Sequence, residues 1–473
     1  MIMYNYKTFL LIGIIALAGC KKFDSSYYVD PNNPAKASGT QLIANAALFL
    51  PSISSSVYGV HYPQYLSLTQ FTDNSRYVAT NLSFSSWYTG PLMNLEKVLS
   101  NQLDANEGPV ENQIAVAKIL KAYFIWFVTD RWGDVPYTEA WKAADNFTPK
   151  YDKQQDIYNS MFTLLDEANS AFILTNGNIR NDIVYNGDVN KWKRFGNTIH
   201  MLMALRLSKV DPNKGKAEFE KALANGIMAA NSDNFFFQHL AEQPMENFWY
   251  NSFTRLGRQW YALSKPLVDY MKPLNDPRLP VFGDKNQAGE YAGLEYGKEV
   301  GSSDDIPLIS LLGTKLRQQN SPVYLVTYPQ ALFAKAEAAK LGWISGGDSE
   351  AENNYKEAIK QSVIMWTGSD AGYSALIAQP SVVYNPADAI RQIAYQRWVH
   401  LFLNGYEGWA EWRRTGFPLL TAPAGANGGQ IPRREGYPTA EANINKANYD
   451  AAVAAFPYGG TDGLNARVWW DKP

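Results

Sequence analysis

Apolar residues recur at helical spacing in long segments along most of this 473-residue chain. Spacings of three and four place such residues on one face of an α-helix. A short helix is expected to begin near Gly39 and to end at Pro51. The same pattern predicts longer helices over residues 111–129, 155–174, 191–210, 212–230, 324–342, 350–366 and 386–403. The chain is therefore predicted to be mostly α-helical.

Successive helical segments follow one another as pairs, as in the tetratricopeptide repeat, a helix-turn-helix unit of about 34 residues. The second helix of that repeat often reads aromatic-x-x-Ala-aliphatic, because a small residue lets neighbouring helices approach closely. Phe219 with Ala222, and Tyr355 with Ala358, fit this pattern. We expect helical repeat pairs over about 111–230 and 324–403.

Residues 231–323 interrupt the pairs and differ from them in composition. They are rich in Gly, Pro, Asn and aromatic residues and show little helical period. A structureless loop of this length is rare inside a compact domain. We therefore expect an inserted irregular lobe built from short helices and hairpins. Residues 61–90 are predicted to be partly irregular, and residues 415–473 are predicted to be irregular because of their Gly and Pro content.

The N-terminus has the pattern of an export signal. Lys7 precedes an almost uninterrupted apolar run over residues 9–17, and small residues then lead to Cys20, the single cysteine. The run is too short to span a bilayer as a mature helix, and a buried N-terminal helix is the alternative. Leu-Ala-Gly-Cys at 17–20 resembles a bacterial lipobox, which implies cleavage before Cys20 and its lipidation. Residues 20–40 are expected to be an extended tether.

Composition argues against several kinds of chemistry. With Cys20 lipidated, the mature chain would hold no thiol for disulfides, thiolate metal sites or nucleophilic catalysis. The net charge of -2 offers no strong field for nucleic acid. His61, His200, His239 and His400 lack metal-binding spacing, and no phosphate-binding loop, dinucleotide fingerprint or G-x-S-x-G elbow occurs. We therefore expect no cofactor or metal. Carboxylates that pair only in space, as in a glycoside hydrolase, stay an open alternative.

Aromatic residues make up 14% of the chain. Most are expected to fill a helical core, but an exposed ring can stack on a sugar while Asn, Asp and Arg bond its hydroxyls. Groups of this kind cluster outside the helical segments. The candidate ligand-binding residues are Arg76, Tyr77, Asn81, Phe84, Trp87, Phe248, Trp249, Tyr250, Asn251, Tyr291 and Tyr296. Among them Trp87 belongs to a longer motif and is the one most open to a core role.

Two other kinds of large side chain are expected to have structural roles. Four tryptophans are predicted to pack in the core, where large rings contribute most to stability: Trp132, Trp398, Trp409 and Trp412. Arg413 and Arg414 are expected to bond backbone carbonyls or carboxylates near the last long helix.

Seven stretches of the chain carry a family resemblance. They are the lipobox, DPNNP (30–34), WYTGPLMNLEKV (87–98), DRWGDVPYTEA (130–140), ALFAKAEAAKLGW (331–343), RQIAYQRWVHLFLNGYEGWAEWRRTGFP (391–418) and IPRREGYPTAEANINKANYDAA (431–452). With them the chain resembles the SusD/RagB family of outer-membrane nutrient-binding lipoproteins, in its shorter SusD-like branch. The stretch 391–418 is the most specific of the seven.

The resemblance implies a domain arrangement and a function. Residues 1–19 would be a lipoprotein signal peptide, 20–40 a lipidated tether and 41–473 a single SusD-like domain. Such proteins capture a nutrient, usually a glycan or oligosaccharide, and cap a TonB-dependent, SusC-like outer-membrane transporter as its lid. The helical face would contact the transporter, and the irregular lobe would carry the ligand. A surface location, lipid-anchored to the outer membrane, and no enzymatic activity are expected.

Three alternatives stay open. The same fold could bind peptides or another non-sugar nutrient, through groups that pair with a peptide backbone instead of flat exposed rings. A repeat adaptor that binds only proteins is the second alternative, but it leaves the aromatic lobe unexplained. A glycoside hydrolase would require two facing carboxylates at a defined separation.

Overall fold

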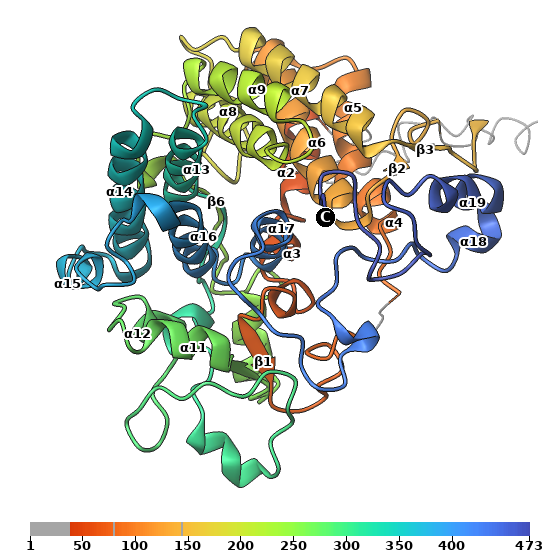
Figure 1. Cartoon of the computed structure of the whole chain (residues 1–473). Helices are drawn as coiled ribbons and strands as arrows, with labels where there is room; N and C mark the ends of the chain where they lie inside the picture. Colours follow the sequence, from red (N-terminus) through yellow and green to blue (C-terminus); the bar gives the residue numbers. More distant parts are fainter. Residues whose placement is uncertain (1–37, 79–80, 143–144) are drawn as a thin grey trace, which may run out of the picture.

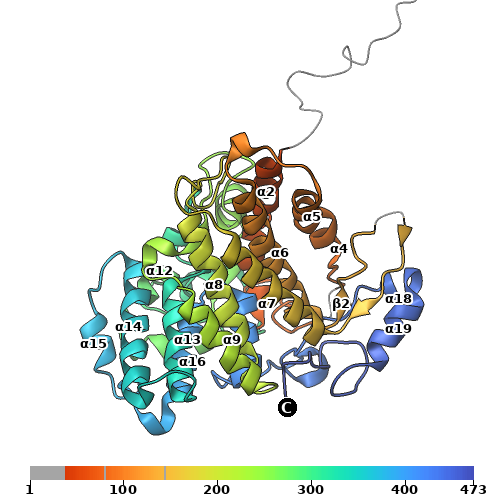
Figure 2. The same cartoon turned by 90° about the horizontal axis from the view of Figure 1, so that it is seen from above.

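Helices packed in pairs form the upper and left parts of the molecule in the view of Figure 1. The computed structural model describes residues 38–78, 81–142 and 145–473. The pairs are α6 (Val110–Trp132) with α7 (Gln154–Ala171), α8 (Val189–Arg206) with α9 (Pro212–Ala224), and α13 (Tyr328–Lys340) with α14 (Gly347–Thr367). Figure 2 shows α8, α9, α13 and α14 side by side. The predicted fold class, mostly α with tetratricopeptide-type pairs, is confirmed.

The repeat pattern read from the sequence marks where the helix pairs meet. Phe219 and Ala222 on α9 are fully buried, as are Tyr355 and Ala358 on α14. Phe219 packs edge-to-face against Trp343, which follows α13, with 5.8 Å between ring centroids. The small and aromatic positions therefore join successive helix pairs into one continuous core.

Helix ends follow local capping signals more than the apolar period. The Asp188 side chain accepts hydrogen bonds from the first amides of α8, and Asp211 caps α9 with Pro212 behind it. Gly133, with a φ of 83°, ends α6 where the sequence predicted a break. The helices predicted to reach residues 210 and 230 stop earlier, at Arg206 and Ala224.

Helix α6 is buried on almost every face. It packs against α7, α8, α2 (Gly39–Ala47) and α5 (Met93–Ser100). By length and hydropathy alone the stretch 39–61 is apolar enough to cross a membrane, yet half of its most apolar part is buried inside the protein. The sequence predicted that Pro51 ends the first helix. Instead, Pro51 begins a further turn, α3 (Pro51–Ser54).

A strand replaces the start of the helix that the sequence predicted over 324–342. β6 (Val323–Val326) pairs antiparallel with β4 (Phe235–Phe237), and α13 begins only at Tyr328. Two local causes account for this difference. The stretch Val-Tyr-Leu-Val favours a strand, and Pro329 has no N–H to donate to the carbonyl four residues earlier, so it fits only the first turn of the helix.

The inserted lobe occupies the lower part of Figure 1 and is tied to distant segments. Its strand β5 (Tyr261–Leu263) pairs antiparallel with β1 (Leu66–Leu68), as β4 pairs with β6. The expected hairpins are therefore wrong for these two ladders, because β1 lies far outside the lobe and β6 begins only at its last residue, Val323. The expected short helices are present as α10 (Phe248–Tyr250), α11 (Lys265–Met271) and α12 (Leu279–Phe282). One hydrophobic cluster joins Leu263 of the lobe to Trp398 and Phe402.

The C-terminal part holds more helix than predicted. The helix predicted over 386–403 is α16 (Ala389–His400), and a further helix, α17 (Gly405–Thr415), follows it. The region predicted to be irregular contains α18 (Glu441–Ile444) and α19 (Lys446–Ala454). The remaining helices and strands are short: α4 (Ser85–Trp87), α15 (Tyr373–Ile377), β2 (Val135–Pro136) and β3 (Tyr151–Asp152).

A buried cluster of ionised side chains ties α17 to the repeat helices. Arg206 of α8 has no exposed side-chain surface, and it donates to Glu407 at 2.7 Å and to Glu411 at 2.5 Å. Its Nε lies 3.2 Å from a carboxylate oxygen of Asp130, at the end of α6. Charges this deep are tolerated only when each has a partner, so the cluster holds α6, α8 and α17 in one arrangement.

Candidate functional site

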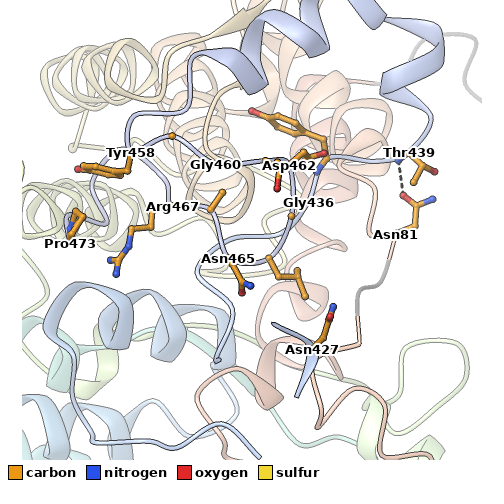
Figure 3. A pocket seen from close by; sticks show the side chains of 16 residues that line it. Asn81, Asn427, Gly436, Thr439, Tyr458, Gly460, Asp462, Asn465, Arg467 and Pro473 are labelled. Atoms are coloured by element: carbon orange, nitrogen blue, oxygen red, sulfur yellow. Dashed lines mark hydrogen bonds between the residues drawn. The ribbon is translucent and has the colours of Figure 1, made fainter. Parts of the chain in front are cut away.

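A cleft of about 790 Å³ lies along the C-terminal segment of the chain (Figure 3). Most of its wall comes from residues 458–467, and Asn427 and Asn81 contribute from two other segments. In the close-up, Tyr458 and Arg467 lie toward one end of the cleft and Asn81 toward the other. The volume falls in the range of ordinary small-molecule sites, about 300–1,000 Å³.

A buried arginine anchors the cleft wall to the helical core. Arg434 donates to Asp462 Oδ1 at 2.8 Å. It also donates, at 3.0 Å, to the carbonyl of Trp132, which is the last residue of α6. Asp462 also accepts from the amide of Tyr437 at 3.0 Å and from the hydroxyl of Tyr449 at 3.1 Å. With these partners the wall has a defined position, even though it contains little regular structure.

Glycines allow the tight turns on which the cleft depends. Gly459 and Gly460 have φ values of 70° and 106°, a backbone region that side-chain-bearing residues rarely adopt. Gly428 approaches Asn465 so closely that a Cβ there would collide with the Asn465 amide. The loop that the sequence marked only as Gly-rich therefore brings Asn427 beside Asn465.

Asn81 is the one predicted site residue in the lining of this cleft. Its side-chain oxygen accepts a hydrogen bond from the amide of Thr439 at 2.9 Å, which leaves its amide nitrogen available (Figure 3). Tyr458 is 38% exposed, and its hydroxyl donates to the carbonyl of Trp469 at 2.8 Å. The hydroxyl is thus occupied while part of the ring stays open to solvent. Arg76 lies close by, and its carbonyl accepts from the amide of Asn427.

The three rings of the first predicted cluster are buried, so none of them presents an open ring face to a ligand. Tyr77 is 2% exposed, and its hydroxyl accepts from the Gln64 amide at 2.9 Å. Phe84 packs edge-to-face on Trp132, and Trp87 packs on Phe127 at 4.7 Å between centroids. Phe84 and Trp87 cover the apolar flank of α6, and Tyr77 packs between Tyr62 and Tyr296, so all three rings face inward.

The second predicted cluster divides between core and surface. Trp249 is 1% exposed, and Asn251 donates its amide to the buried carboxylate of Glu246 at 3.0 Å. Phe248 is 38% exposed, and Tyr250 is partly exposed with the Arg255 guanidinium 5.7 Å from its ring. None of these residues lines the cleft.

The two tyrosines of the Gly-rich stretch also differ in exposure. Tyr291 is partly exposed, with the Lys285 ammonium 5.8 Å from its ring. Tyr296 is buried and donates its hydroxyl to the carbonyl of His61 at 2.5 Å. Burial raises the pKa of Tyr296 well above its ordinary value. Tyr296 therefore presents no open ring face to a ligand, and its hydroxyl is already bonded within the protein.

An aromatic group that sequence reasoning missed lies on the lobe. Phe71 is 67% exposed and packs edge-to-face on Trp260, with 5.2 Å between centroids. The Arg258 guanidinium lies 4.5 Å from the same indole. Phe71 has a φ of 55°, a rare value for a bulky residue. An isolated Phe gives no period or motif, so the sequence carries no signal for this pair.

The tryptophans and paired arginines that were predicted to have structural roles are buried or bonded within the protein. Trp132, Trp398 and Trp409 are buried, and Trp412 is partly buried against the same core. The predicted bonds of the paired arginines are confirmed as well: Arg413 donates to the carbonyl of Arg433 at 3.0 Å, and Arg414 donates to Glu337.

The titratable groups show no arrangement for metal binding in residues 38–78, 81–142 and 145–473. No group of three or more His, Cys, Asp or Glu side chains that could hold an ion occurs there. His61 bonds the carbonyl of Leu66, and burial lowers the pKa of this histidine to about 4. His200 and His400 bond Glu218 and Thr327, so each ring has a structural partner.

Helices of the repeat type that support a polar cleft are typical of a binding protein. Comparisons with known protein families and solved structures identify the family to which the chain belongs. A family model called SusD-like, described as starch-binding and associating with the outer membrane, matches residues 31–438. The chain belongs to this SusD-like family. The match ends at residue 438, so the cleft wall at 458–467 lies beyond it.

Solved structures agree with the family over nearly the whole chain. A chitin-binding protein is 30% identical, with 92% of this chain and 98% of that chain covered and a TM-score of 0.79. A SusD homologue from Bacteroides thetaiotaomicron is 26% identical, with 93% and 100% covered and a TM-score of 0.79. A chitin-binding SusD homologue from Flavobacterium johnsoniae has the same fold, with 24% identity, 92% and 98% covered and a TM-score of 0.75. No curated protein sequence matches.

Proposed function

We propose that this protein captures an oligosaccharide in the C-terminal cleft at the cell surface. The observation that carries the proposal is the cleft itself, about 790 Å³ in volume and lined by amide and hydroxyl side chains with the partly open ring of Tyr458. Sugars present many hydroxyls and a flat C–H face, and such a lining meets both. Membership of the SusD-like family supports a glycan, as does the chitin-binding protein that shares 30% identity.

The exposed aromatic pair on the lobe would extend the sugar contacts. Phe71 and Trp260 present ring surface outside the cleft, and Arg258 beside them can donate to hydroxyls. Among the predicted candidates, Arg76, Asn81, Phe248, Tyr250 and Tyr291 keep side-chain surface for such contacts. They are proposed as ligand contacts on that ground.

The bound glycan would then pass to a TonB-dependent, SusC-like transporter that this protein covers as a lid. The lipobox at 17–20 supports anchoring in the outer membrane through Cys20, which lies outside the described residues. Several acyl chains on one residue would hold the protein firmly, since a single chain binds only marginally. The helical pairs would supply the face toward the transporter.

Peptide capture is a weaker candidate for this cleft. A peptide commonly adds a strand to an exposed sheet edge. In the described part of the chain the named sheets have only two strands each, and each strand is two to four residues long. The cleft is lined mainly by side chains, and no residue of these strands is among its lining residues. A protein-only adaptor would leave the cleft without a role.

Affinity electrophoresis on a polysaccharide panel tests the proposal. The purified full chain should be retarded by at least one glycan and should release no oligosaccharide from it. The variant N427A/N465A should lose most of this retardation, whereas Asn353→Ala, on the exposed face of α14, should retain it. Released oligosaccharide would support the hydrolase alternative. Binding to peptides without binding to any glycan would overturn the proposal.

Co-purification tests the transporter partnership separately. The full chain, tagged and extracted from outer membranes in mild detergent, should bring down a TonB-dependent transporter in a fixed ratio. A C20S variant that is exported but unanchored should bring down much less. Recovery of the intact protein without any transporter would contradict the lid role while leaving glycan binding in place.

A further inference from the structure

The two aspartates at the cleft wall already accept hydrogen bonds from inside the protein. Asp462 accepts from three groups, namely the Arg434 side chain, the Tyr437 amide and the Tyr449 hydroxyl. Asp471, which is fully buried, accepts from the guanidinium groups of Arg433 and Arg467. Most of the acceptor capacity of both carboxylates is therefore used, and little is left for the donors of a ligand.

Arg467 brings a positive charge to the cleft that the protein neutralises only in part. Its side chain is 29% exposed, and Asp471 is the only carboxylate that pairs with it in the described part of the chain. The same carboxylate is shared with Arg433, which donates to it through Nε at 2.8 Å and through a second nitrogen. Two guanidinium groups thus share one negative charge, and a positive charge is left over.

The lining also holds hydrogen-bond donors that the protein does not use. Arg467 donates to Asp471 through Nη1 alone, so Nε and Nη2, which form one edge of its guanidinium, bond nothing in the described residues. Asn81 uses its oxygen and keeps its amide nitrogen. Three further lining side chains make no hydrogen bond within those residues: Asn427, Thr461 and Asn465. Figure 3 shows Arg467 at the same end of the cleft as Tyr458, so charge and ring surface meet there.

From this surplus of positive charge and of donors, we infer that the cleft takes an acidic oligosaccharide, whose carboxylate or sulfate group binds the open edge of Arg467. The inference rests on the proposed function and names the ligand class of that site. Two N–H groups on one planar edge fit two oxygens of such a group. The Tyr458 ring would pack on the sugar that carries the charge, while the amide side chains bond its hydroxyls.

Isothermal titration of the full chain with matched pairs of tetrasaccharides tests the inference. One pair is tetragalacturonate and its full methyl ester, which is the same sugar without charge. The other is a sulfated carrageenan tetrasaccharide and its desulfated form. We expect at least one acidic member to bind about tenfold or more tightly than its neutral counterpart, and the pair that shows this identifies carboxylate or sulfate as the bound group. That binding should weaken from low to physiological salt, because it includes a partly exposed ion pair.

Variants at Arg467 link the preference to this cleft. Arg467→Gln removes the charge and should reduce the preference for the acidic member to about twofold or less, whereas Arg467→Lys keeps the charge and should retain more of it. Lys356→Gln removes one positive charge from the exposed surface of α14 and should leave the preference unchanged. Arg433 stays paired with Asp471 in each variant, so we expect the fold to be retained, which thermal melting checks.

The results separate this inference from the proposed function. If the neutral members bind as tightly as the acidic ones, or if the tetramer of N-acetylglucosamine binds more tightly than both acidic tetramers, the acidic site is wrong and glycan capture stands. A preference that survives Arg467→Gln would also overturn the inference, because the selecting charge would then lie elsewhere. If no tetrasaccharide binds, acidic or neutral, the inference and the proposed function are both rejected.

Discussion

Arg414 of α17 donates two parallel hydrogen bonds to Glu337 of α13, at 2.6 and 2.7 Å. Both side chains are almost fully buried. Burial alone would raise the pKa of Glu337, but Arg414 and Arg397 outweigh it and hold that pKa below its usual value. The pair therefore stays ionised inside the protein, and it joins the last long helix to the third repeat pair.

Removing the negative partner should be strongly destabilising. In Glu337→Gln, Arg414 and Arg397 keep their charges but lose a carboxylate, so the free energy of unfolding should fall by about 3–5 kcal/mol. Chemical denaturation monitored by circular dichroism measures this. Glu352→Gln removes an exposed pair with Lys356 on α14 and should cost less than about 1 kcal/mol. Equal effects of the two substitutions would contradict the conclusion that Glu337 is a buried, ionised partner of the two arginines.

His400 should make the protein less stable in mild acid. Burial and the positive charges of Arg278 and Arg397 together lower the pKa of His400 to about 3. Below pH 6.5 the unfolded chain takes up a proton here and the folded protein does not, so stability falls as the pH falls. From pH 7 to pH 5 this one group should remove about 2 kcal/mol. Denaturation curves at both pH values should show that His400→Gln loses about 2 kcal/mol less than the unchanged protein. Parallel losses would refute the prediction.

Tyr458 should act in the cleft through its ring. Tyr458→Ala removes a partly exposed ring from the lining and should weaken oligosaccharide binding by about tenfold. Tyr458→Phe keeps the ring and loses only the bond to the Trp469 carbonyl, so it should bind within about threefold of the unchanged protein. Titration calorimetry separates the two. Equal losses would assign the effect to loop position instead of ring contact.

Phe71 should contribute to binding but little to stability. Asn tolerates the left-handed backbone at this position, so Phe71→Asn should change the free energy of unfolding by less than about 1 kcal/mol. Affinity for an oligosaccharide long enough to reach the lobe should fall by about threefold to tenfold. Phe147→Ala, which removes another highly exposed ring, is the matched control and should bind normally. Unchanged affinity in Phe71→Asn would remove this ring from the proposed ligand surface.

Cys20→Ser should detach the protein from membranes without altering its binding. The lipobox predicts that the acyl chains on Cys20 are the anchor. Fractionation should find the variant in the soluble fraction, with the melting temperature and glycan affinity of the delipidated protein. Retained membrane association would refute the lipoprotein prediction.

The helical repeat face was predictable because its signals are local. The spacing around Phe219 and Tyr355 identifies buried helix faces, and Gly133 and Pro212 mark helix ends within a few residues. The strand β6 was missed because its pairing with β4 joins residues about 90 positions apart, beyond any local period. Ring burial was misjudged for the same reason: a polar, aromatic neighbourhood around Tyr77 or Trp249 does not say which side of the ring faces the core.

The sequence by itself determined the helix pairs and the family, and it predicts the export signal, since each depends on residue types at short, fixed spacings. Only the tertiary structure decided where a ligand can lie. Asn81, Asn427 and Asn465 belong to three segments, and they line one cleft because Arg434 and Asp462 hold the C-terminal wall against the end of α6. The bonds from Thr439 to Asn81 and from Arg434 to Trp132 join residues more than 300 positions apart, which no local pattern records.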